Sequence, residues 1–227
     1  MLATTEPNSH PFVLRIESVV LVALSEAEKD ALAALPMHVA EYDTYQDIAS
    51  EHDRPGRAFA VLSGIVFSYK ATQEGGRQIM AYHVAGDVPD FQSMHLEVLD
   101  FSLAAATPCR VGFVPHDTLR ALCHTYPRLG DAFWRTTRID GALAREWLLN
   151  IGQREAYPRL AHLFCELITR LKAVGLAHGR SCALPLSQAV LADAMRHDGP
   201  ARHHTGFAGS DPRKGARSEA ADALVFL

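Results

Sequence analysis

Cysteine is scarce in this chain, and the few cysteines present are scattered. The four are Cys109, Cys123, Cys165 and Cys182, and no two lie within a few residues of each other. This spacing lacks the paired ligands of a metal site and provides no disulfide framework. We therefore interpret the cysteines as buried, unreactive thiols.

The sequence also lacks a long apolar run and an excess of basic residues. No stretch approaches the roughly 20 apolar residues that cross a bilayer. The first 20 residues lack the basic start, continuous apolar core and cleavage site of a signal peptide. The net charge is −4, so any surface that binds nucleic acid must be local. We expect a cytoplasmic protein with no membrane partner.

Between about residues 37 and 115, the apolar residues come in short runs separated by turn signals. The turns include Ser63-Gly64 and Gly75-Gly76, and the second pair suits a tight hairpin because glycine reaches positive φ at little cost. Short strands at intervals of about ten residues predict a β-sandwich or jelly roll. The expected strands cover residues 59–62, 65–69, 78–84 and 109–114.

Helical patterns lie on both sides of this region. Residues 26–35 have helical spacing, with Ser25 as a plausible N-cap. A short helix is expected to begin at residue 116 and to end near Pro127. After a break at Pro158, another helix is expected over about 160–171, because its leucines share one face.

The longest predicted helix runs from about residue 128 to residue 153. Its apolar residues recur at helical spacing over more than six turns, which is long for a globular helix. A long amphipathic helix between two domains often buries its stripe against a second copy, although packing within one chain is the alternative. We predict a homodimer whose interface contains Phe133, Ile139, Leu143 and Trp147.

Four motifs occur in an order typical of one protein family. They resemble the family patterns VLxGxV, G-[KR]-x-[IL], xGD and LPLTQxxLAD. The matching segments are Val61–Val66, Gly75–Ile79, Ala85–Asp87 and Leu184–Asp193. Over about residues 37–195 the chain therefore resembles the Crp/Fnr superfamily of bacterial transcription factors.

The resemblance implies an α+β fold with a jelly-roll β domain, a long dimerisation helix and a C-terminal winged helix-turn-helix. We assign residues 1–127 to the sensor, 128–156 to the dimerisation helix and 157–227 to the DNA-binding domain. Family members dimerise and bind palindromic operators. We expect DNA contacts from Ser187, Gln188, Arg196 and Arg202, and RNA polymerase as a further partner.

Cyclic nucleotide is the first ligand that the family suggests, and the sequence argues against it. The family holds the cyclic phosphate with a G-E pair after its GD turn and an R-S/T pair further on. Here Asp90 and Phe91 stand where the G-E pair would be, and residues 78–109 contain no Lys or Arg. An acidic site without a guanidinium repels phosphate. We predict that no cyclic nucleotide binds.

Other family cofactors also lack ligands here. An Fnr-type iron–sulfur cluster needs several cysteine thiolates, and none precedes Cys109. A haem would have to rely on a lone histidine. We predict no cofactor and an unidentified signal. Asp90, Gln92, Ser93 and His95 would form the polar lining of a pocket at the former phosphate site, or only a surface loop.

Enzyme motifs are missing. There is no glycine-rich phosphate loop, no HExxH and no GxSxG. His203 and His204 could suggest a metal site, but their segment has no apolar period, so we interpret it as a solvated tail. A cupin-like metalloenzyme is the nearest rival, because a jelly roll with clustered histidines could bind a metal. The histidines of the β region are not spaced like cupin ligands, so we predict no enzyme and no metal.

The resemblance ends after Met195. The family continues with a turn, a recognition helix and a β-wing. Here Pro200 and four glycines disfavour a helix, and Phe207 is the only large apolar residue between 196 and 215. A recognition helix needs an apolar face to pack on its partner. We hypothesise a reading-frame shift near codon 196, and the alternative is a divergent tail.

This C-terminus affects the predicted function. Basic residues such as Arg196 and Arg202 could still contact phosphates, but such contacts do not read sequence. We therefore predict weak or no operator-specific binding by this polypeptide. The first function is a DNA-binding transcription regulator, and the alternative is a dimeric sensor that has lost specific DNA binding.

Overall fold

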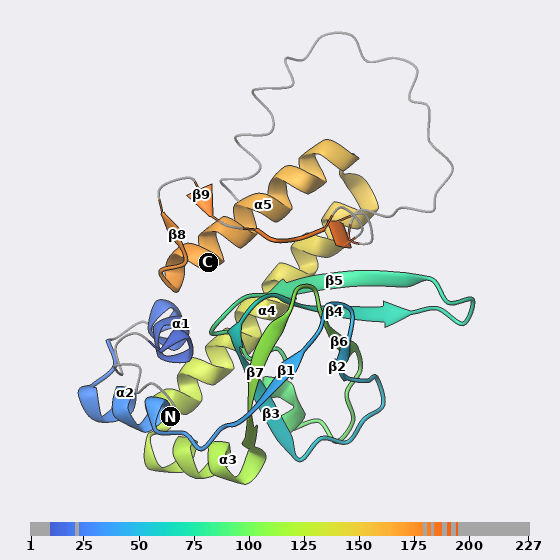
Figure 1. Cartoon of the computed structure of the whole chain (residues 1–227). Coiled ribbons are helices and arrows are strands. Elements are labelled where there is room, and N and C mark those ends of the chain that lie inside the picture. The colour runs from blue at the N-terminus through green and yellow to red at the C-terminus, as the bar shows by residue number, and fades with distance from the viewer. Residues whose placement is uncertain are drawn as a thin grey trace, which may run out of the picture.

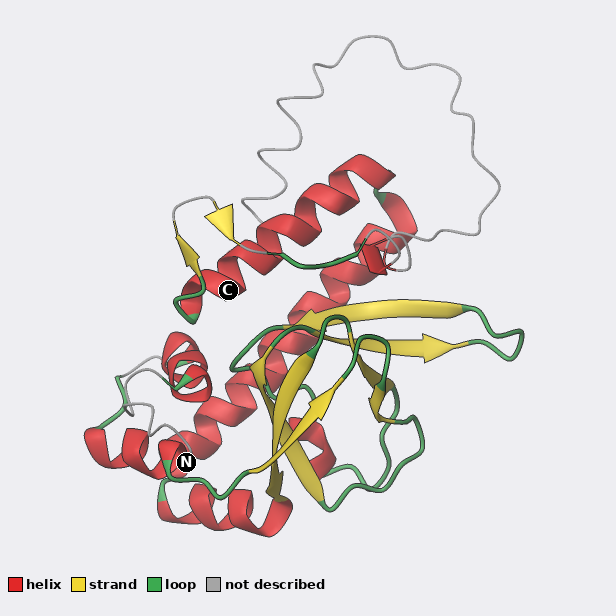
Figure 2. Cartoon of the chain, in the orientation of Figure 1, coloured by secondary structure: helices red, strands yellow, loops and turns green. Residues whose placement is uncertain are grey.

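The computed structural model describes residues 10–20, 23–178, 181–182, 184–187, 190–191 and 194. A β domain lies beside a long helix, α4, which runs diagonally behind it (Figure 1). The first three helices gather at one end of α4, and α5 lies near the other end (Figures 1 and 2). The chain therefore has the α+β organisation that the sequence predicts over these residues.

The β domain consists of two antiparallel sheets. One has the strand order β1-β7-β3 and the other β2-β6-β4-β5. Apolar side chains from both sheets form the core between them, including Phe59, Val66 and Leu103. The strands are β1 His38–Tyr42, β2 Asp47–Ala49, β3 Arg57–Ser63, β4 Val66–Ala71, β5 Arg77–His83, β6 Ser102–Ala105 and β7 Cys109–Pro115, with a separate hairpin of β8 Ala177–His178 and β9 Ser181–Cys182.

Beside the β domain lie five α-helices and a short 3-10 helix whose bounds the structure gives, in addition to the helix that starts after Ser187. They are α1 Pro11–Val19, α2 Glu26–Ala33, η2 Phe91–Met94, α3 His116–Thr125, α4 Pro127–Gln153 and α5 Ala156–Ala173. Ser25 caps α2 in a reciprocal arrangement with Glu28, as its position before the helix predicts. The sequence analysis expected a break at Pro158. Instead, Pro158 lies in the first turn of α5, where a missing N–H costs little, and the helix includes it.

Helix α1 is absent from the sequence prediction and matters for the whole arrangement. Pro11 begins the helix, and the His10 ring accepts a hydrogen bond from the Phe12 N–H. Phe12, Val13 and Ile16 are buried, at spacings that follow one helical face. This face packs on α4, whose apolar stripe is thereby covered from within the chain.

The residues of the predicted dimer interface are buried within the single chain. Phe133 stacks on Phe91 and Phe12, with ring centroids 4.5 and 6.1 Å away, and is 3% exposed. Ile139 and Leu143 pack on Val19 of α1. None of these side chains can reach a second copy, because α1 and η2 cover them.

Trp147, the fourth residue of the predicted interface, is buried in the same way. Its ring lies 6.0 Å from that of Tyr82, and its Nε1 donates a hydrogen bond to Glu166 of α5 over 2.9 Å. The long helix was predicted correctly, but this stripe faces the chain's own α1, η2 and α5. The exposed side chains of α4 lie on other faces of this helix.

Candidate sensor and DNA-binding sites

The predicted pocket residues lie on and around η2, but they have different environments. Asp90 is 2% exposed and its Oδ1 accepts the Phe59 N–H at 3.1 Å. Ser93 is also buried, with its hydroxyl 2.9 Å from Nε2 of His116. Gln92 is half-buried and His95 is exposed. Asp90 and Ser93 therefore connect η2 to β3 and to α3.

Of these four residues, Asp90 also lines a surface pocket of about 550 Å³. Phe59 and Phe113 supply apolar walls, and Arg54 and Arg57 contribute cations. The Arg57 guanidinium lies 4.0 Å from the centre of the Phe113 ring. Sequence reasoning looked for a cation only within residues 78–109, so it missed the two arginines that the fold brings to Asp90.

The buried carboxyl group of Asp90 should make the free energy of unfolding decrease as the pH rises. Burial raises the pKa of Asp90 to about 7, although backbone hydrogen bonds from Phe59 and Asp90 itself oppose the rise. The folded chain therefore holds a proton that the unfolded chain releases near pH 4. Stability should fall as the pH rises from about 4 to about 7, by roughly 1 kcal/mol per pH unit from this group.

The Asp90→Asn variant is expected to lose this contribution, because an amide does not titrate. Urea unfolding at pH 5, 6 and 7 would compare its slope of free energy against pH with that of the wild type. Asp117→Asn, at an exposed position, is the control and should keep the wild-type slope. Equal slopes for Asp90→Asn and the wild type would contradict the assignment.

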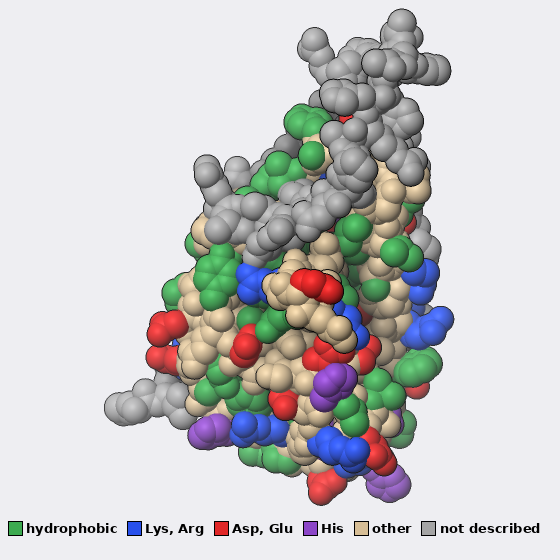
Figure 3. All heavy atoms as spheres, turned by 90° about the vertical axis from the view of Figure 1, so that its right-hand side faces the viewer, with side chains coloured by type: hydrophobic (Ala, Val, Ile, Leu, Met, Phe, Trp, Pro, Cys, Tyr) green, Lys and Arg blue, Asp and Glu red, His purple; other side chains and the backbone are tan. Residues whose placement is uncertain are grey.

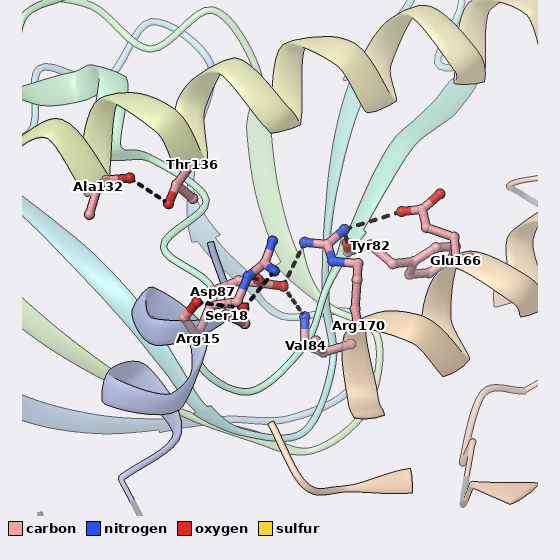
Figure 4. Close-up of polar contacts among 9 residues, drawn as sticks. All are labelled: Arg15, Ser18, Tyr82, Val84, Asp87, Ala132, Thr136, Glu166 and Arg170. Atoms are coloured by element: carbon pink, nitrogen blue, oxygen red, sulfur yellow. Dashed lines mark hydrogen bonds and ion pairs between the residues drawn. The ribbon is translucent and has the colours of Figure 1, made fainter. Parts of the chain in front are cut away.

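A second polar cluster lies where the β domain meets α1 and α5 (Figure 4). The Asp87 carboxylate accepts hydrogen bonds from Arg15 Nε at 2.8 Å and from Arg170 Nη2 at 2.6 Å. It also accepts the Val84 N–H at 2.7 Å. Burial alone would raise the pKa of Asp87, but Arg170 and Arg15 outweigh burial and hold that pKa below its usual value.

Arg170 reaches two further groups of this cluster. Its Nη1 donates to the Tyr82 carbonyl oxygen at 2.8 Å and to Glu166 at 3.1 Å. The side chains of Arg170, Asp87 and Glu166 are each at most 4% exposed. The GD motif singled out Asp87 as a turn residue, but nothing local in the sequence indicated its two arginine partners.

The described part of the segment that the sequence analysis assigns to DNA binding begins with a helix N-cap, as the sequence predicts. Ser187 is exposed, its Oγ accepts the Val190 N–H at 3.3 Å, and Leu191 N–H donates to the Ser187 carbonyl. These are the contacts of a helix N-cap. Gln188, Arg196 and Arg202 lie outside the described residues, as does the whole segment after Met195 whose abnormal composition suggested a frame shift.

A second stripe on α4 remains exposed. Trp134 is 66% exposed and Leu148 is 72% exposed, and Arg138, Gly141 and Arg145 lie between them at spacings of three and four residues. Tyr157 at the start of α5 is 76% exposed. Both stripes of α4 carry apolar residues, so the sequence pattern alone could not say which one the chain covers.

The charges of the described surface are mixed on the face that Figure 3 presents. Lys and Arg side chains alternate there with acidic ones, and no large area of one sign is visible (Figure 3). Within the described residues, no group of three or more His, Cys, Asp or Glu side chains could hold a metal ion. No helix in that part of the chain has the length and apolar character of a membrane span.

Comparisons with known proteins show which domain and which fold this chain resembles. A sequence model described as the cyclic nucleotide-binding domain matches residues 40–126. Electron transport regulator A of Shewanella oneidensis is 30% identical over 112 residues, covering 49% of this chain and 45% of that protein. The nitrogen fixation regulation protein FixK of Azorhizobium caulinodans is 29% identical over 137 residues, covering 60% of this chain and 54% of that protein.

By these matches the chain resembles regulators of the Crp/Fnr family. The structure of FixK2 from Bradyrhizobium japonicum shares its fold, with a TM-score of 0.60 and 24% identity over 70% of this chain and 77% of that one. The matches span about half the length of these two curated relatives. These relatives, with the fumarate and nitrate reduction regulatory protein of Vibrio cholerae, are named as regulators.

Proposed function

We propose that this chain is a cytoplasmic, dimeric transcription regulator of the Crp/Fnr type whose β domain responds to a signal. The observation that carries the proposal is the order of parts along the chain. A domain of the cyclic nucleotide-binding family is followed directly by α4, α5 and the N-capped helix after Ser187. In this family, that order places a DNA-binding segment under the control of the sensor.

The second copy would pack on the exposed stripe of α4. Trp134 and Leu148 supply apolar surface that is otherwise left in water, and the stripe recurs at the spacing of a coiled-coil seam. Contact across this stripe would place the two DNA-binding segments on one side of the dimer. RNA polymerase would then be a partner of the assembled dimer.

We propose a small molecule as the signal, without naming the compound. Asp90 is buried at the place where the family holds a cyclic phosphate, and its carboxylate would repel one whenever it is ionised. We expect no cyclic nucleotide to bind and no iron–sulfur cluster to form. The pocket beside Asp90, with Arg57 stacked on Phe113, is the place where we expect a small molecule to act.

The second candidate function is a dimeric sensor without specific DNA binding. The composition of residues 196–215 favours it, because a single large apolar residue cannot anchor a recognition helix. Both functions share the sensor and the dimer, and they differ only in whether the dimer reads DNA.

Selection from a pool of random DNA duplexes with the full chain tests this proposal. For the regulator function, any sequence that is enriched should be a palindrome with half-sites about one helical turn apart. We expect weak binding that is lost as the salt approaches about 0.15 M, because phosphate contacts contribute most of the affinity. Enrichment of no sequence at any salt concentration would overturn the DNA-binding function and favour the dimeric sensor. Tight, sequence-dependent binding at 0.15 M salt would refute the weak-binding prediction.

A further inference from the structure

The carboxylate of Asp87 joins three parts of the chain that are far apart in sequence. It lies in the turn after β5, and it binds Arg15 of α1 and Arg170 of α5 at the same time. In Figure 4 both arginines point toward Asp87 from opposite sides. One sensor carboxylate thus contacts both the N-terminal helix and the first helix that follows the long helix α4.

The same region holds the start of the DNA-binding segment against the sensor. The Tyr82 hydroxyl donates a hydrogen bond to the Val190 carbonyl oxygen at 2.9 Å, and the Tyr82 carbonyl accepts one from Arg170. Val190 and Ala194 are fully buried in a cluster with Leu163, Leu167 and other side chains of the junction. The C-terminal helices are therefore docked on β5 of the sensor.

This junction brings several buried charged groups close together. Arg170 faces the carboxylates of Asp87, Glu166 and Asp140, Arg15 pairs with Asp87, and His83 is buried beside them. Burial, together with Arg170, lowers the pKa of His83 to about 3, so its ring is neutral at pH 7. Burial raises the pKa of Asp140 to about 6, so its charge is the one that changes most readily near neutral pH.

Several polar atoms of this junction also find no hydrogen-bond partner among the described residues. They include Nη2 of Arg15, Nε of Arg170 and both ring nitrogens of His83. Unpaired polar atoms disfavour burial, and a buried ion pair contributes little net stability because both charges regain water when it separates. Opening the junction would therefore lose apolar contacts but would rehydrate several charged groups.

We propose that the Asp87–Arg170 pair is a clasp that holds α5 and the helix after Ser187 on the sensor. Opening of the clasp is the step by which the sensor changes the presentation of the C-terminal helices. Arg15 is part of the clasp, because it keeps the Asp87 carboxylate in place from the α1 side. The purpose of the clasp rests on the proposed regulatory function, but its existence does not depend on DNA binding.

The test uses Trp147, which lies under α5 and donates a hydrogen bond to Glu166. The chain has only two tryptophans, so Trp134→Phe leaves Trp147 as the single fluorophore. In this background, Arg170→Met removes the clasp from the α5 side and leaves Asp87 bound to Arg15 and Val84. We expect acrylamide to quench Trp147 about threefold more efficiently than in the parent, as α5 undocks.

Arg54→Met is the matched control, since it breaks the exposed pair with Glu97 and should leave quenching unchanged. Asp87→Asn is a second variant, and it should increase quenching in the same direction as Arg170→Met. Hydrogen exchange of β3 and β7, measured in parallel, should stay slow in both variants.

Two results would overturn the clasp. Unchanged shielding of Trp147 in both variants would mean that the pair does not hold α5. Loss of exchange protection throughout β3 and β7 would mean that the pair supports the whole fold and is not a separable junction. Neither readout involves DNA, so failure of the DNA selection would leave this test unaffected.

Discussion

Phe133→Ala is expected to lower the free energy of unfolding by about 3–5 kcal/mol. Phe133 is 3% exposed and stacks between Phe12 of α1 and Phe91 of η2, so its removal leaves a cavity among three elements of one chain. Urea unfolding followed by circular dichroism measures this change.

The neighbouring Trp134→Ala is the control for this experiment. Trp134 follows Phe133 on the same helix but is 66% exposed, so its removal should cost less than about 1 kcal/mol of the chain's own stability. An effect of Phe133→Ala as small as the one expected for Trp134→Ala would restore the interpretation in which the Phe133 stripe faces a second copy.

Gly64→Ala should destabilise the chain by about 3 kcal/mol. Gly64 has a φ of +81°, which costs an alanine about 1–2 kcal/mol. An added Cβ would also lie 2.5 Å from the Pro108 carbonyl oxygen and 2.6 Å from the Cys109 Cβ. The turn between β3 and β4 would have to move away from the start of β7.

Gly75→Ala separates these two causes. Gly75 has nearly the same φ, +82°, but a Cβ there would meet nothing within 4 Å. We expect a loss of only about 1 kcal/mol, from backbone strain alone. Thermal and urea unfolding of the two variants side by side would test the comparison, and equal losses would show that close packing at Gly64 contributes nothing.

The sequence predicts the β domain where its strands are apolar. Strands β3, β4, β5 and β7 carry the runs that were recognised, because their residues are buried on one or both faces. Strands β1 and β2 are short and half-exposed, so they have no apolar run to detect. Strand β6 is buried but has only four residues, too few for a clear period.

The long helix was predicted at the right residues, but the sequence did not show which face of this helix the chain itself covers. Residues 128–153 were predicted as a helix, and α4 covers Pro127–Gln153. Its burial depends on α1, which was not recognised, although Phe12, Val13 and Ile16 follow a helical face. Without α1, the stripe that contains Phe133 seemed to need a second copy.

The junction at Asp87 could not have been predicted from a local pattern. Arg15 is 72 residues and Arg170 is 83 residues from Asp87 in the sequence. Only the folding of α1 and α5 onto the same turn brings them together. Asp90 illustrates the opposite case, because its position in the motif predicted a place of interest, whereas its bond to the Phe59 N–H depends on the fold.

Sedimentation velocity of the wild-type chain beside Leu148→Glu tests the central claim most directly. We predict that the wild type sediments as a dimer of the 24.9 kDa chain. Leu148→Glu would place two carboxylates against each other across the symmetric seam and should weaken the dimer at least about 100-fold, or roughly 3 kcal/mol. The control Leu96→Glu, an exposed leucine outside α4, should remain dimeric. A wild-type chain that stays monomeric at every concentration, or a Leu148→Glu variant as dimeric as the control, would contradict the account.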